Sequence, residues 1–136
     1  MEFIRQRITI INLRKPKEQN INEELQWFGG TIGLFSKRDK DKSCFRIFIT
    51  LIKNIKTNNE GLTSDEIATI TKLTRGTVIH HINRLMESGI VTNEKNKYVI
   101  KVEKLEELVE LLQQNIDKTL ENLKAIARDI DEKLEL

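Results

Sequence analysis

The spacing of apolar residues divides the chain into a mixed beginning, a run of short helices and one long helix. Apolar side chains from Cys44 to Ile55 surround most of a helix, which predicts a largely buried element. Val78, Ile82 and Leu85 follow the i, i+4, i+7 spacing of an amphipathic helix. From about Lys104 to the end, apolar residues recur every three or four positions without Gly or Pro, which predicts one long amphipathic helix.

Capping signals predict two short helices joined by a tight turn. Thr63 and Glu66 form a Thr-x-x-Glu capping box, so a helix is expected to begin there. Its expected inner face consists of Ile67, Ala68 and Ile70. The turn is expected at residues 71–73. The second helix, from about Thr74 to Ser88, is capped by Thr74 and stops at Gly89, a natural left-handed position.

Extended segments are expected after this helix pair and at the beginning of the chain. An extended run from Ile90, a polar turn at 93–97 and a second run at 98–102 predict a β-hairpin. The alternation from Phe3 to Leu13 favours a half-buried strand, with a short helix as the alternative.

A short helix is expected to follow this N-terminal segment. Pro16 breaks the segment, and Asn20 with Glu23 resembles a capping arrangement that begins the helix. Gly29 and Gly30 are expected to stop it. Residues 36–42 then read as a charged loop, and residues 58–61 as a turn.

The charge of the chain is divided unevenly along its length. Up to Ile100 there are 17 Lys and Arg against 11 Asp and Glu, a net of +6. From Lys101 onward there are 6 against 10, a net of −4. A basic body joined to an acidic tail suggests that the body meets a polyanion, whereas chance surface charge is the plainer alternative.

Composition narrows the class of protein. With 38% hydrophobic and 32% charged residues the chain can build a core, unlike a disordered segment. Its single cysteine, Cys44, excludes an intrachain disulfide and a cysteine-rich zinc site, which fits a reducing compartment such as the cytoplasm. No run approaches the roughly 20 apolar residues of a membrane span, so neither export nor membrane insertion is expected.

The segment from Leu62 to Val91, LTSDEIATITKLTRGTVIHHINRLMESGIV, resembles the winged helix-turn-helix transcriptional regulators of the ArsR and MarR type. The matching positions are Val78, His80, His81, Ile82, Leu85, Ser88, Gly89, Ile90 and Val91. The resemblance covers about a third of the chain well and leaves the N-terminal segment and the last helix uncovered. It implies a dimer that places two recognition helices in successive major grooves, with the wings toward the minor groove or backbone.

The expected fold is therefore mainly α with a small β-wing, a winged helix-turn-helix, plus a long C-terminal helix. Three parts are predicted: residues 1–35 as an N-terminal strand and helix extension, 36–102 as the DNA-binding domain, and 103–136 as a coiled-coil dimerisation helix.

The outer face of the second helix carries residue types that can read a groove, because Asn pairs bidentately with adenine and Arg with guanine. Its first turn offers backbone N–H groups to a phosphate. The candidate DNA-binding residues are Thr74, Arg75, Gly76, Thr77, His80, Asn83 and Arg84 on the helix, and Asn93, Lys95, Asn96 and Lys97 on the wing. The wing residues are the candidates for phosphate contacts.

The last helix is long enough, at roughly 45 to 50 Å, to extend beyond a domain of this size. Its regular stripe favours pairing with a second copy, and folding back on its own domain is the alternative. The candidate dimerisation residues are Leu112, Ile116, Leu120, Leu123, Ala127, Ile130 and Leu134.

No metal or cofactor is expected. His80 and His81 are adjacent, so on a helix they diverge by about 100 degrees and cannot easily chelate one ion. A structural role is favoured for His81, whereas DNA contact and simple exposure remain open for His80. Cys44 is expected to be buried rather than a redox switch, and Trp27 and Phe28 to be packing residues.

The predicted function is that of a homodimeric, sequence-specific transcriptional regulator of double-stranded DNA. Catalysis is not expected, because no phosphate loop, nucleophile elbow or His pair on one helix face occurs. A protein-interaction module in a transcription or chromatin assembly is the alternative. Double-stranded RNA is a weaker option, since the narrow major groove of A-form RNA excludes a helix. The operator, any small-molecule effector, the direction of regulation and the role of the first 35 residues are not given by the sequence.

Overall fold

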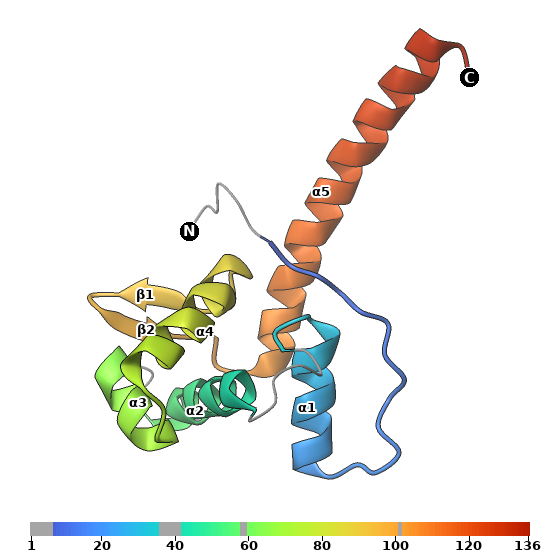
Figure 1. The fold of residues 1–136 in the computed structure, drawn as a ribbon. Coiled ribbons are helices and arrows are strands. Elements are labelled where there is room, and N and C mark those ends of the chain that lie inside the picture. The colour runs from blue at the N-terminus through green and yellow to red at the C-terminus, as the bar shows by residue number, and fades with distance from the viewer. Residues whose placement is uncertain (1–6, 36–41, 58–59, 101) are drawn as a thin grey trace. The chain divides into compact units, whose positions relative to one another are not determined.

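The computed structural model describes residues 7–35, 42–57, 60–100 and 102–136, which form helices and one small antiparallel sheet (Figure 1). The elements are α1 (Ile21–Thr31), α2 (Ser43–Thr57), α3 (Ser64–Thr71), α4 (Arg75–Glu87), β1 (Thr92–Glu94), β2 (Lys97–Val99) and α5 (Leu105–Leu134). The chain forms two compact units, the first ending at Lys101 and the second beginning at Val102.

Helix α2 is the centre of the first unit and packs on α1, α3, α4 and β2. Its buried apolar side chains are Cys44, Phe45, Ile47, Phe48 and Leu51. The ring of Phe48 stacks on that of Phe28 from α1, with centroids 6.3 Å apart. The prediction of a largely buried helix from Cys44 to Ile55 is confirmed, and burial of this much apolar surface is the main force that holds the unit together.

The capping box that begins α3 is present. The Thr63 side chain accepts from the Glu66 N–H, and the Thr63 N–H donates to Glu66 Oε1, both at 3.1 Å. Hydrogen bonding from Thr63 to the Glu66 carboxyl, first from the backbone N–H and second from the side chain, lowers the pKa of that carboxyl. Their stabilising effect is therefore present above the pKa that Glu66 has in the unfolded chain, and is lost as the pH falls through the folded-state value.

The inner face of α3 differs from the prediction. Ile67 is fully buried, but Ile70 is 58% exposed and Thr71 is buried instead. The eight-residue helix turns its 67/71 edge inward, and Thr71 tolerates burial because its hydroxyl donates to the Ile67 carbonyl at 2.7 Å. The assignment of Ile70 to the inner face was wrong.

Helix α4 follows the prediction closely. Lys72, with φ 58°, turns the chain out of α3, and Thr74 caps α4 through its side chain. The spaced residues Val78, Ile82 and Leu85 are all fully buried. Gly89 has φ 81°, the left-handed conformation expected of it.

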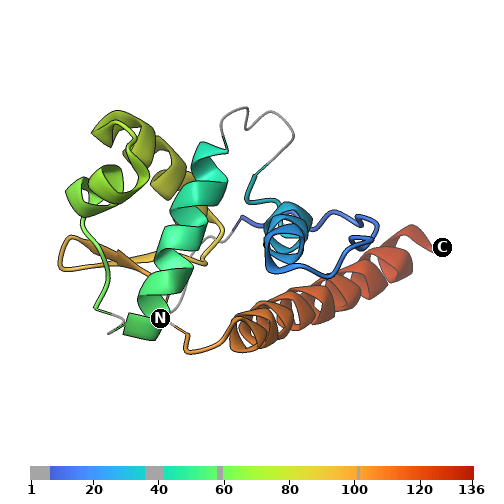
Figure 2. The same cartoon turned by 90° about the horizontal axis from the view of Figure 1, so that it is seen from below.

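The two strands form the predicted hairpin, whose tip lies on the side of the unit away from α1 in both views (Figures 1 and 2). The turn is shorter than the predicted one at 93–97, because Asn93 and Lys97 belong to the strands. Lys95 and Asn96 alone form the turn, both with positive φ, as in the two-residue turns that match the twist of paired strands. Leu62 pairs with Tyr98 on the other edge of β2.

The N-terminal extension differs from the prediction. Residues 7–16 are not a strand, and the part before Arg7 lies outside the described residues. This segment is held by single backbone contacts, such as the bond from the Ile11 N–H to the Thr31 carbonyl at 2.8 Å. The loop at 36–41 and the turn at 58–59 also lie outside the described residues.

Helix α1 begins at the predicted Asn20 cap, whose side chain accepts from the Glu23 N–H at 2.9 Å. It does not stop at Gly29 and Gly30 but continues to Thr31. Gly29 serves packing, since a Cβ there would lie 1.9 Å from a ring carbon of Phe35. The chain leaves the helix at Gly33 instead, with φ 72°.

The arrangement of α2, α3, α4 and the hairpin is a winged helix-turn-helix, so the predicted fold class is confirmed. The second unit is the predicted long helix, whose 30 residues extend for about 45 Å. Only Leu108 and Leu112 of α5 are buried. No helix of the described residues is long and apolar enough to cross a membrane.

Candidate nucleic-acid interface

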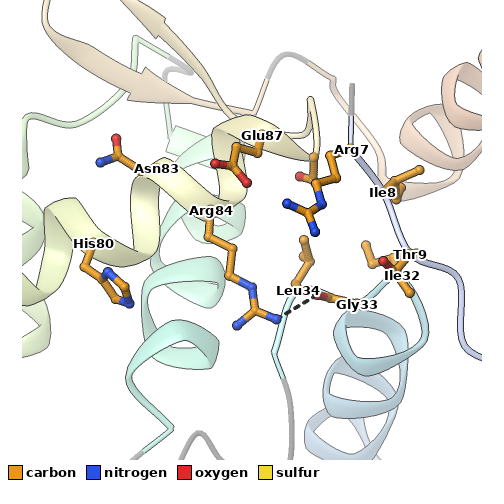
Figure 3. Close-up of a pocket in the computed structure, with 11 residues that line it drawn as sticks. Arg7, Ile8, Thr9, Ile32, Gly33, Leu34, His80, Asn83, Arg84 and Glu87 are labelled. Carbon is orange, nitrogen blue, oxygen red and sulfur yellow. Dashed lines mark hydrogen bonds between the residues drawn. The ribbon is translucent and has the colours of Figure 1, made fainter. Parts of the chain in front are cut away.

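The outward face of α4 is polar, and the N-terminal extension approaches its second half. Of the predicted helix residues, Thr77 is half-buried, and the exposed ones are Thr74, Arg75, Gly76, His80, Asn83 and Arg84. His80, Asn83 and Arg84 project from the same helix away from its buried side (Figure 3). The structure therefore brings the predicted reading residues together on one surface.

The first turn of α4 is arranged to receive an anion. Thr74 Oγ1 accepts from the Thr77 N–H at 3.2 Å and hydrogen-bonds to Thr77 Oγ1 at 2.9 Å, so both hydroxyls serve the cap. The N–H groups of the two preceding helical residues have no acceptor within the helix, as at every helix start. No acidic residue belongs to this first turn, which favours an approaching phosphate.

Gly76 has no structural reason to be glycine within the described residues. A Cβ at this position would meet nothing within 4 Å, and the backbone is ordinary helix. The missing side chain leaves the backbone of the first turn open to close approach by an external group.

Two arginines lie near the turn of the helix-turn-helix, and one of them, Arg46, fixes the end of α3. Arg46, from α2, donates to the Thr71 carbonyl at the end of α3, a role that sequence reasoning missed. The sequence did contain a signal for this role, because Arg46 is a single basic residue within the apolar run of α2. Arg75 lies 3.7 Å from Asp65, but both side chains are more than 70% exposed. Such a pair is weak in water, so Arg75 is available to a phosphate.

Arg84 is directed across the outer face of α4 rather than along it. Its Nη2 donates to the Gly33 carbonyl at 3.4 Å (Figure 3). A cleft of about 470 Å³ lies here, between α4 and the N-terminal extension. We call it the α4 cleft; it is lined by Arg7, Ile8, Thr9, Ile32, Gly33, Leu34, His80, Asn83, Arg84, Glu87 and Ser88. Sequence reasoning missed the contribution of the extension.

The wing places two predicted residues, Lys95 and Asn96, at its exposed tip. Asn93 is exposed, but its side-chain oxygen accepts from the Asn96 N–H at 3.1 Å and so stabilises the turn. Lys97 is half-buried. Two lysines within three residues leave the wing suited to sequence-independent contact with phosphates.

The predicted dimerisation stripe of α5 divides into two parts. Leu112 is buried and Ile116 half-buried, whereas every residue from 117 to the end is exposed. The large apolar side chains in this exposed part are Leu120, Leu123, Ile126, Ile130, Leu134 and Leu136. Ala127, also exposed, continues the stripe of Leu120 and Leu123. Ile126, which was not predicted, widens the apolar surface.

The remaining candidates have structural roles. Cys44 is buried and its thiol donates to the Leu34 carbonyl at 3.2 Å, as expected of a packed residue. Trp27 donates from Nε1 to the Leu13 carbonyl at 3.3 Å. His81 is half-buried and its ring meets that of His80 edge to face. Among the described residues no group of three or more His, Cys, Asp or Glu could hold a metal ion.

A profile of the winged helix-turn-helix DNA-binding family matches residues 45–92, which run from α2 through α4 to the first residue of β1. Comparisons with curated proteins and with solved structures give no match. The matched residues contain the capped, outward-facing α4 described above. The chain therefore carries a winged helix-turn-helix domain of the DNA-binding type.

Proposed function

We propose that this protein is a homodimeric regulator of transcription, similar to the ArsR and MarR type, that binds double-stranded DNA with sequence specificity and without catalysis. The observation that carries the proposal is the outward face of α4, where Asn83, Arg84 and His80 are exposed beside an open first turn. This helix lies within the part of the chain that matches a DNA-binding family.

In this proposal α4 enters the major groove. Asn83 and Arg84 contact base edges, where each bidentate pair contributes about 1 to 3 kcal/mol of discrimination. The open N–H groups at the start of α4 bind a backbone phosphate and fix the position of the helix. Lys95 at the wing tip and Lys97 beside it bind further phosphates, so they contribute affinity without sequence preference.

The exposed stripe of α5 supports the homodimer. A single recognition helix reads too few base pairs to select a site, and pairing two copies would present two helices about 34 Å apart, one turn of DNA. The apolar side chains beyond residue 116 are the part of α5 that a second copy could bury.

The direct test is a mobility-shift titration of the full chain on fragments of the source genome. We expect duplex binding at low salt and a steep fall in affinity as salt rises, because bound phosphates release counterions. Binding should select a subset of fragments under competition. If no duplex is shifted at low salt, the proposal fails, and the alternative of a protein-interaction module takes its place.

Substitutions on the helix and on the wing should have different consequences. Replacing Asn83 and Arg84 by alanine should bring the affinities for specific and random duplexes close together. Replacing Lys95 and Lys97 by alanine should weaken binding to the specific and the random duplex about equally. It should also make the slope of log affinity against log salt concentration shallower by about two, because two phosphate contacts are lost. Equal loss of specificity in the two double variants, measured by fluorescence anisotropy, would contradict the assignments.

The Gly76→Ala variant should bind DNA less well although its fold is unharmed. The fold offers the new methyl group open space, and alanine favours helix over glycine by up to about 1 kcal/mol. A methyl group facing a phosphate would push the helix outward, so we expect about a ten-fold loss of affinity with an unchanged or higher melting temperature. Unchanged affinity would show that no backbone phosphate approaches this turn.

A further inference from the structure

The N-terminal extension is attached to the second half of α4 through its backbone. The backbone N–H of Arg7 donates to the carbonyl of Glu87, the last residue of α4, at 2.9 Å. Further along the extension, the Ile11 N–H donates to the Thr31 carbonyl at the end of α1, at 2.8 Å. Backbone bonds therefore fix the position of Arg7, and they leave its exposed side chain available for other contacts.

The side chain of Arg7 joins the polar surface that α4 presents. Its guanidinium is directed into the α4 cleft, as is that of Arg84 (Figure 3). Asn83 and His80 line the same cleft from α4, and Glu87 is the acidic residue in its lining. Among the described residues, neither arginine forms an ion pair with a carboxylate. Two guanidinium groups directed into one open space repel each other, and an anion between them would be stabilised by both.

Cations flank α4 on two sides of the first unit. The wing tip, which carries Lys95, lies on the side of the unit away from α1, whereas the extension that carries Arg7 is bonded to α1 (Figures 1 and 2). The major groove of B-DNA is about 12 Å wide, and a phosphate backbone borders it on each side. A helix inserted into this groove has a row of phosphates on either side, so cations on both sides of α4 match these surroundings.

We propose that Arg7 binds a phosphate of the DNA backbone, on the edge of the major groove opposite to the edge that the wing contacts. This assignment rests on the proposed function and adds the N-terminal extension to the DNA interface as a third part, beside α4 and the wing. The extension does not obstruct the groove-reading end of α4, because the first turn of the helix does not line the α4 cleft. In helix-turn-helix proteins the beginning of the recognition helix contacts base edges, which leaves its end, where Arg7 lies, nearer the backbone.

The test is a fluorescence-anisotropy titration of the full chain on a specific and a random duplex at several salt concentrations. Arg7→Gln should weaken binding to both duplexes by the same factor, about three- to five-fold, as for the loss of one exposed ion pair. The slope of log affinity against log salt concentration should become shallower by about one, because one phosphate contact is lost. Arg7→Lys keeps the charge and should keep the slope of the wild type.

Arg14→Gln is the matched control, because Arg14 is an exposed arginine of the same extension that does not line the α4 cleft. It removes the same charge and should leave both the affinity and the slope unchanged. All of these variants should keep the urea denaturation midpoint of the wild type, since the bond to Glu87 uses the backbone of residue 7 rather than its side chain.

The place of the contact on DNA is tested by ethylation interference, which identifies a phosphate that the protein needs because its ethylation prevents binding. Arg7→Gln should lose interference at about one phosphate in each half-site, consistent with one lost charge. The wing variant, with Lys95 and Lys97 replaced by alanine, should retain interference at this phosphate. The phosphates that the wing variant loses should lie on the opposite edge of the major groove.

The assignment of Arg7 is wrong if Arg7→Gln keeps the affinity and slope of the wild type, if Arg14→Gln has an equal effect, or if Arg7→Lys has the same shallow slope as Arg7→Gln. Loss of interference at the same phosphates as in the wing variant would also overturn it. A loss of affinity confined to the specific duplex would show that Arg7 reads a base rather than a phosphate. If the wild-type chain shifts no duplex at low salt, the proposed function fails and the assignment fails with it.

Discussion

Replacing Leu123 and Ile130 by aspartate is expected to convert the proposed dimer into a monomer and to lower its affinity for a two-half-site DNA fragment by about 100-fold or more. Both side chains are exposed in the single chain, at 59% and 46%, so burial by a second copy is what they would contribute. Each large aliphatic side chain contributes about 1.5 to 3 kcal/mol when fully buried, and the dimer contains each of them twice. Four buried carboxylates would oppose pairing further.

In the proposed dimer, DNA affinity would depend on dimerisation, because the second half-site would be bound intramolecularly. Once one recognition helix is in place, the effective concentration of the other is in the millimolar range, which raises the affinity by two or more orders of magnitude. A monomer keeps the reading face of α4 but loses this gain. It should therefore bind a fragment with two half-sites no better than a fragment with one.

Ala125→Asp is the control, because residue 125 is exposed and lies on the side of α5 opposite Leu123. It adds one carboxylate per chain, half the charge of the double variant, together with the helix penalty of an aspartate, without touching the stripe. Sedimentation velocity at several concentrations gives the oligomeric state, and fluorescence anisotropy the DNA affinity. If the double variant stays dimeric, or if the wild-type chain is monomeric at micromolar concentration, the second half of α5 does not form the interface.

Local signals made the helix-turn-helix predictable from the sequence. The Thr63 capping box, the Thr74 cap and the spacing of Val78, Ile82 and Leu85 all act within one turn or two of the chain. Their geometry does not depend on distant residues, so the structure reproduces them. The same holds for the outward face of α4, since a helix with one buried face must expose the opposite one.

The N-terminal extension could not be predicted in this way, because its conformation depends on contacts far along the sequence. The backbone N–H of Arg7 donates to the carbonyl of Glu87, 80 positions away. The alternating pattern of residues around Arg7 does not indicate this contact. Gly29 was misread for a related reason: glycine usually ends helices, but here it makes room for Phe35. The α4 cleft could not be predicted from the sequence, because one wall comes from the N-terminal extension and the other from α4.

Replacing Ile82 by alanine should destabilise the first unit by about 2 to 5 kcal/mol, the cost of an internal cavity at a fully buried aliphatic residue. Domains of this size have total stabilities of about 5 to 15 kcal/mol, so a substantial part of the folding free energy would be lost. Urea denaturation followed by circular dichroism at fixed protein concentration measures the change. A slope m equal to that of the wild type would show that the folded state is otherwise intact.

Ile70→Ala is the matched control and decides between the sequence prediction and the structure. Both positions carry isoleucine on a helix of the same helix-turn-helix, and the sequence placed both on inner faces. Because Ile70 is 58% exposed, its loss should change the stability by no more than about 0.5 kcal/mol, partly offset by the better helix propensity of alanine. If Ile70→Ala costs as much as Ile82→Ala, then Ile70 is buried in solution and α3 is rotated relative to the arrangement described, which would also move the turn that positions the first residues of α4.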